Sequence, residues 1–146
     1  MIPLLSIHFK ESDVREMGRT AMGVWSIKLK KGDMVISAEA VPNALNNATL
    51  MVISQNGYGK CTDIDEYKVQ HRGGSGIKTA KVTLKTGSLI SAKVFTEGSG
   101  EIAAISKKSQ VIRVDAKEIP VLGRQTQGVR VMKLREGDSI ASLICL

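Results

Sequence analysis

The stretch LMVISQNGYGKCT, residues 50–62, carries the clearest folding signal in the chain. Apolar and β-branched residues fill positions 50–54, and a second strand-like run follows at 59–62. Between them lies Asn56-Gly57, a dipeptide that favours tight hairpin turns because both residues accept a positive φ. We therefore predict a β-hairpin here. Its counterpart has strands at 101–106 and 111–114, joined by a turn at 107–110.

A second kind of hairpin is predicted three times along the chain. Residues 25–30 alternate between apolar and polar side chains, which is typical of a strand with one buried face. Similar segments occupy 77–85 and 129–135, and a glycine-containing turn follows each of the three. More hydrophobic return strands, with both faces buried, are then predicted at 34–41, 89–95 and 139–146. Two hairpins make four strands, the content of one propeller-type blade.

The chain is thus predicted to be a single all-β domain, residues 1–146, with repeats at approximately 1–42, 48–96 and 101–146. Only residues 1–6 stand where the first repeat should have its first strand and turn, so about two and a half to three blades are present. A half-blade leaves strand edges unpaired, which soluble proteins rarely leave open. Either another chain covers the edge, for example in a homodimer that closes a ring, or this is one piece of a longer polypeptide.

Charge points to a polyanionic partner. The formal net charge is +7 and the pI is near 9.6, which favours nucleic acid first and an acidic membrane surface second. Simple solubility is the alternative explanation of such a charge. The two cysteines do not have the spacing of a metal site or a redox pair. No apolar run reaches the length of a membrane helix, about 18 residues. Residues 1–7 lack the features of a signal peptide. We therefore expect a cytosolic protein.

The positive charges recur at fixed spacing. An arginine stands four residues before a glycine, and a lysine stands five residues after it, in three places about 52 residues apart. A repeat that returns basic residues to the same place predicts a positive track. The triplets are Arg19/Gly23/Lys28, Arg72/Gly76/Lys81 and Arg124/Gly128/Lys133.

The middle triplet lies in a glycine-rich stretch, QHRGGSG at 70–76, whose backbone N–H groups could face an anion. Together with NGYGK at 56–60, FKESDVREMGR at 9–19 and GRQTQGVR at 123–130, this stretch resembles the repeats of the C-terminal domain of the DNA gyrase A subunit. The likeness runs from residue 7 onward and corresponds to the last three of that family's six repeats. It does not separate gyrase from the related topoisomerase IV A subunit.

The resemblance implies a β-pinwheel, a propeller-like disc whose blades exchange strands and whose basic rim bends DNA. The family's signature box is Gln, a basic residue, Arg, Gly, Gly, Lys, Gly. Five positions match the box: Gln70, Arg72, Gly73, Gly74 and Gly76. His71 and Ser75 replace two basic positions, which indicates a degenerate copy and puts in doubt any role of the full box in wrapping.

The expected function is therefore a DNA-binding and DNA-bending accessory module of a type IIA topoisomerase, without catalysis, cofactor or metal of its own. Implied partners are double-stranded DNA and, within the enzyme, the B subunit plus the catalytic part of the A subunit, in the bacterial nucleoid. The alternative is a protein-interaction propeller that binds an acidic partner. The predicted DNA-contacting residues are Arg19, Lys28, Lys60, Arg72, Lys78, Lys81, Arg113, Arg124, Arg130 and Lys133.

Overall fold

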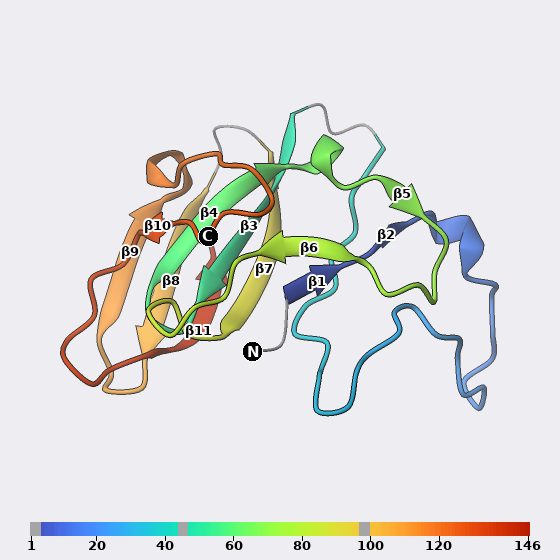
Figure 1. The fold of residues 1–146 in the computed structure, drawn as a ribbon, viewed down its shortest axis with the longest axis horizontal. Coiled ribbons are helices and arrows are strands. Elements are labelled where there is room, and N and C mark those ends of the chain that lie inside the picture. Colours follow the sequence, from blue (N-terminus) through green and yellow to red (C-terminus); the bar gives the residue numbers. More distant parts are fainter. Residues whose placement is uncertain (1–3, 44–46, 97–99) are drawn as a thin grey trace.

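The computed structural model describes residues 4–43, 47–96 and 100–146, which we call the first, second and third segments (Figure 1). The expected all-β architecture is confirmed, and three single turns of 3-10 helix are the only helices in these segments. The elements are β1 (Leu4–Ser6), β2 (His8–Phe9), η1 (Glu11–Asp13), β3 (Ala48–Ser54), β4 (Tyr58–Asp63), η2 (Ile64–Glu66), β5 (Val69–Gln70), β6 (Ile77–Ala80), β7 (Leu89–Thr96), β8 (Glu101–Ser106), β9 (Val111–Asp115), η3 (Ala116–Glu118), β10 (Val129–Arg130) and β11 (Ile140–Cys145).

The hairpin predicted at 50–62 forms the centre of a four-stranded sheet with the order β10-β4-β3-β7. Within it, β3 and β4 pair antiparallel, with Val52 opposite Lys60. The return strand β7 pairs with the other edge of β3. The fourth strand, β10, comes from the third segment and joins β4 through Val129 opposite Gly59. One segment thus completes the sheet of the segment before it.

The same exchange joins the first and second segments. Strand β6 pairs antiparallel with β1, with Ile77 opposite Ser6, and β5 runs parallel to β2. In the third segment, β11-β8-β9 form a three-stranded sheet in which β9 lies at the edge. Among the described residues no strand pairs with the outer side of β9.

The apolar core lies between the four-stranded and three-stranded sheets, at one end of the molecule (Figure 1). Alternate residues of β3 and β8 supply much of it, because side chains at every second strand position point to one face. Its fully buried members include Met51, Ile53, Ile102, Met132 and Ile140. No described residue before Ala48 is buried, so the first segment adds nothing to this core.

The strands predicted at 25–30 and 34–41 are wrong. Residue 27 makes only an isolated parallel bridge to Gly74, and 34–41 has no strand in the structure. The matching segments in the rest of the chain pair with a neighbour: β10 with β4, and β7 with β3. The first segment has no such neighbour among the described residues, and Trp25 and Met34 are 74% and 71% exposed.

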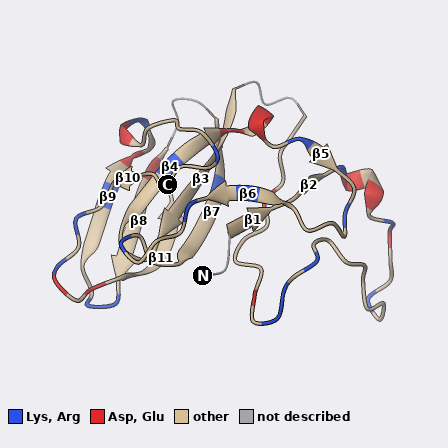
Figure 2. Ribbon diagram, in the orientation of Figure 1, with Lys and Arg blue, Asp and Glu red and all other residues tan. Residues whose placement is uncertain are grey.

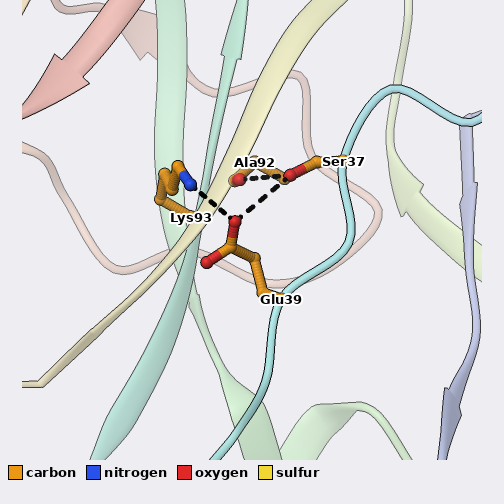
Figure 3. A network of polar contacts seen from close by, with 4 residues as sticks. All are labelled: Ser37, Glu39, Ala92 and Lys93. Carbon is orange, nitrogen blue, oxygen red and sulfur yellow. Dashed lines mark hydrogen bonds and ion pairs between the residues drawn. The ribbon is translucent and has the colours of Figure 1, made fainter.

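Side chains hold residues 37–39 against β7 in place of a strand ladder (Figure 3). The hydroxyl of Ser37 donates to the carbonyl oxygen of Ala92 at 2.8 Å, and the ammonium of Lys93 binds the carboxylate of Glu39 at 2.7 Å. The hydrogen bond from Lys93 to Glu39 raises the pKa of the lysine. We call this group the β7 latch.

Two other strands are shorter than predicted, and two are less buried. Only Ile77–Ala80 and Val129–Arg130 of the segments 77–85 and 129–135 are strands. The return strands are predicted to be buried on both faces, but β7 is half-buried throughout and most of β11 is exposed. Both pair with only one strand, at a sheet edge.

Candidate nucleic-acid interface

The stretches 70–76 and 123–128 occupy corresponding places, each against the segment before it. Gly76 has φ of +73° and Gly128 has φ of +82°, in the region that favours glycine. A Cβ on Gly76 would lie 2.5 Å from the carbonyl oxygen of Ser6, and one on Gly128 would lie 2.5 Å from that of Gly59. The repeated glycine is therefore required where one segment's backbone crosses closely over another's.

The arginines of these stretches bind the backbone of the preceding segment. Arg72 donates from Nη1 to the carbonyl oxygen of Trp25 at 3.2 Å and from Nε to that of Asp13 at 2.9 Å. Arg124 donates from Nη1 to the carbonyl oxygen of Lys78 at 2.9 Å. Trp25 and Lys78 each stand two residues after the repeated glycine of their own segment, so the two contacts are equivalent. Both guanidinium groups therefore stabilise the contact between two successive segments, which we call the seam.

A phosphate contact by Arg72 or Arg124 stays a prediction, but both residues are only partly exposed, and their guanidinium groups bind the neighbouring backbone. Arg19, the third arginine of the pattern, is exposed and makes no ion pair with a described residue. Its segment has no preceding one among the described residues, so it lacks the seam that the other two brace.

The prediction that Lys60 contacts DNA is wrong. Its side chain is 0% exposed, and Nζ donates to the carbonyl oxygens of Gly123 and Arg124, both at 2.7 Å. Desolvation by burial lowers the pKa of Lys60 to about 8; the charge of Arg124 also lowers it, and that of Glu66 opposes the shift. Lys60 therefore clamps the start of the 123–128 stretch onto β4.

The three lysines of the triplets are exposed. The backbone N–H of Lys28 donates to the carbonyl oxygen of Gly74 at 2.8 Å, and that of Lys81 donates to Thr126 at 3.1 Å. These equivalent bonds fix the backbone, while the side chains of Lys28, Lys81 and Lys133 form no ion pair with any described residue. They are free to bind an anion.

Three predicted DNA contacts remain, and they differ in whether another side chain already binds them. Lys78 is exposed and forms no ion pair within the described residues, whereas Arg113 forms an ion pair with Glu101. Arg130 is exposed, and its Nη2 donates to the hydroxyl of Tyr58 at 3.1 Å.

In the box itself, Gln70 lies half-buried in β5, and Gly73 donates its N–H to the carbonyl oxygen of Ser26 at 2.7 Å. Ser75 and His71 are exposed, with His71 Nδ1 3.7 Å from a carboxylate oxygen of Asp13. Several polar groups of the box therefore contact the first segment.

Acidic residues lie in or beside the three 3-10 turns and in several loops, whereas the more numerous basic residues are spread from one end of the long axis to the other (Figure 2). Such a distribution suits a long polyanion better than a small ligand. Within segments 4–43, 47–96 and 100–146 no cluster of three or more His, Cys, Asp or Glu residues is arranged to hold a metal, and no helix has the length and apolarity to cross a bilayer.

Sequence reasoning named Arg130 but missed the basic cluster that it forms with Lys85 and Arg135 in a hollow beside Tyr58. Lys85 and Arg130 lie over the ring of Tyr58. Lys85 lies 45 residues before Arg130 in the sequence, and the pairing of β10 with β4 brings the two arginines to the segment that holds Lys85 and Tyr58. The spacing of lysines and arginines alone carried no signal for it.

The family model for the DNA gyrase C-terminal domain, beta-propeller, matches residues 6–42, 48–96 and 100–146. The DNA gyrase A protein of Staphylococcus epidermidis is 38% identical over 137 residues, which are 94% of this chain and 15% of the relative. The corresponding protein of Thermotoga maritima is 35% identical over 142 residues, 97% of this chain and 17% of the relative. The chain thus spans a small part of these curated relatives.

Solved structures agree. A DNA gyrase A C-terminal domain superposes with a TM-score of 0.81 at 32% identity, covering 92% of this chain and 45% of that one. The C-terminal domain of DNA topoisomerase IV has a TM-score of 0.87 at 22% identity, covering 97% and 43%. The predicted pinwheel fold is confirmed.

Proposed function

This chain belongs to the DNA gyrase C-terminal domain family, and we propose that it is a non-catalytic module that binds duplex DNA and bends it for a type IIA topoisomerase. The observation that carries the proposal is the recurrence of Lys28, Lys81 and Lys133. One exposed, unpaired lysine stands at the equivalent place in each segment. Phosphates spaced along a curved duplex would meet successive segments.

In this proposal the contacts go to DNA phosphates and are nearly independent of base sequence, because isolated lysines carry no base-reading geometry. If about six phosphates are neutralised, log K should fall with log[salt] at a slope of about −5. The contacts must also offset the cost of bending, roughly 1 to 6 kcal/mol for 20 to 30 base pairs curved by 40 to 90°.

The larger assembly is proposed on the same grounds. The curated relatives are gyrase A subunits, so we infer that the module works beside the catalytic part of an A subunit, together with a B subunit, in the bacterial nucleoid. Its own role would be to hold and curve a DNA segment.

The test replaces Lys28, Lys81 and Lys133 together by Gln and measures affinity for a duplex at several salt concentrations. We expect the salt slope to become shallower by about 2.7, at about 0.9 for each phosphate that is no longer neutralised. The matched control replaces Lys10, Lys68 and Lys117 by Gln. These lysines are also exposed, one lies in each segment, and their replacement removes the same charge. The control should leave the slope nearly unchanged.

Equal losses in the two triple variants would mean that only net charge matters and would overturn the lysine track. A slope near zero for the native chain would sink the DNA proposal. It would favour the alternative of a module that binds an acidic protein.

A further inference from the structure

A hollow of about 250 Å³ opens beside Tyr58, between the start of β4 and the turn after β10. Three of the side chains that line it are cationic, Lys85, Arg130 and Arg135, and one is acidic, Asp138. They come from two segments, so the hollow exists only because β10 completes the sheet of the second segment.

The ring of Tyr58 fixes two of these cations. The ring is buried, with 6% of the residue exposed, and it lies 5.4 Å from Cζ of Arg130 and 5.5 Å from Nζ of Lys85. A cation within about 6 Å of an aromatic centroid is attracted to it. The Tyr58 hydroxyl also accepts from Arg130, and Asn56 Nδ2 donates to the carbonyl oxygen of Lys85 at 3.0 Å. Cations held in this way lose little further entropy on binding a ligand.

The positive charge of the hollow is not neutralised within it. Among the described residues, no carboxylate forms an ion pair with Lys85, Arg130 or Arg135. Asp138 is occupied elsewhere: its carboxylate accepts from the Ser106 hydroxyl and from backbone N–H groups of the nearby turns. Desolvation raises its pKa, but these hydrogen bonds outweigh it and lower the pKa overall.

We propose that this hollow binds one phosphate group, through Arg130, Arg135 and Lys85. Arginine offers paired N–H donors that match phosphate oxygens, and the lysine adds a point charge. Assigning that phosphate to the DNA backbone rests on the function proposed above, whereas binding of a phosphate group by the hollow does not.

The neighbouring pair of segments supplies a comparison. Lys78 lies opposite Leu5 in the β6–β1 pair, as Arg130 lies opposite Tyr58 in the β10–β4 pair. The first pair thus has a cation but no aromatic ring to hold it. Lys78→Gln is therefore a control that removes a positive charge at the matching position.

The experiment titrates the ¹⁵N-labelled chain with inorganic phosphate at constant ionic strength and follows the backbone amide of Tyr58 and the Nε–H of Arg130. We expect saturating shifts in the native chain and in Lys78→Gln. The double variant Arg130→Gln/Arg135→Gln should bind phosphate at least tenfold more weakly, with the Tyr58 amide as its readout. Both arginines are exposed, so retained spectral dispersion will show that the variant folds. Linear shifts, or equal affinity in the double variant, would overturn the site.

A competing 20-base-pair duplex then identifies the source of the phosphate. Displacement of inorganic phosphate by the duplex supports a seat for the DNA backbone. Duplex binding without displacement assigns the hollow to a free phosphate and removes DNA as its ligand. Normal duplex binding with no phosphate response refutes the hollow alone, and a phosphate response with no duplex binding refutes the proposed function alone.

Discussion

Arg72 and Arg124 donate to carbonyl oxygens of the preceding segment, so each arginine stabilises the seam between two segments. Arg19 has the same place in the sequence pattern but no seam to brace among the described residues. The same residue type therefore has a structural role in two segments and leaves its charge exposed in the first.

We expect Arg72→Ala to lower the free energy of unfolding by about 1.5 kcal/mol, because hydrogen bonds from a charged, half-buried donor are removed. Arg19→Ala, an exposed control, should change it by less than about 0.5 kcal/mol. Urea unfolding followed by circular dichroism measures both. Equal stability losses would contradict the bracing role of Arg72.

The clamp at Lys60 predicts an unusual pH dependence. The folded-state pKa of about 8 lies below the ordinary value of 10.5, so between these values the unfolded chain binds more protons than the folded chain. Stability contributed by this group therefore rises with pH in that window. Relative to Lys60→Met, the native chain should gain about 1 kcal/mol of unfolding free energy between pH 8 and 9.5. Urea titrations at several pH values measure the gain, and parallel profiles for the two proteins would refute it.

At the scale of elements, the crossing of β10 over β4 depends on Gly128. A Cβ there would overlap the carbonyl oxygen of Gly59, whereas one on Gly23 would meet nothing within 4 Å, although φ is positive at both. Gly128→Ala should therefore lose about 1 to 3 kcal/mol more stability than Gly23→Ala, because only the former forces backbone apart. Thermal and urea unfolding of the two variants give the comparison; similar losses would show that backbone strain alone matters.

Alternation and turn residues were sufficient to predict β3, β4, β8 and β9, because each pairs with its neighbour in sequence. Alternation and turn residues failed to predict the structure of 25–30 and 34–41. A segment becomes a strand only when another strand pairs with it, and the residues of these two segments do not show whether such a partner is present. Lys60 failed for a related reason. The sequence placed it in the strand-like run 59–62 and among the DNA contacts, but which segment covers its side chain depends on packing far along the chain.

At the scale of the whole molecule, several strands lie at sheet edges and pair on one side only among the described residues. The outer edge of β9 is one of them. The homodimer expected from the sequence stays a prediction, and the outer edge of β9 is where we expect a second copy to add a strand.

We expect the native chain to associate as its concentration rises, because unpaired edges recruit strands. Val111→Lys should reduce this association, since Val111 is 66% exposed on β9 and an edge charge opposes strand addition. Multi-angle light scattering over a concentration series measures the mass. A constant monomer mass would exclude this dimer, and an unchanged dimer in Val111→Lys would place its interface elsewhere.

The absence of buried residues among those described before Ala48 has a mechanical consequence. The first segment is joined to the rest by short strand pairs, by the bonds of Arg72 and by the β7 latch, while the two sheets that follow share an apolar core. Local opening costs least where few apolar contacts must be broken. If a bent duplex exerts an elastic force on the molecule, the first segment would therefore open locally before the apolar core does. The molecule would then have one compliant end and one stiff end.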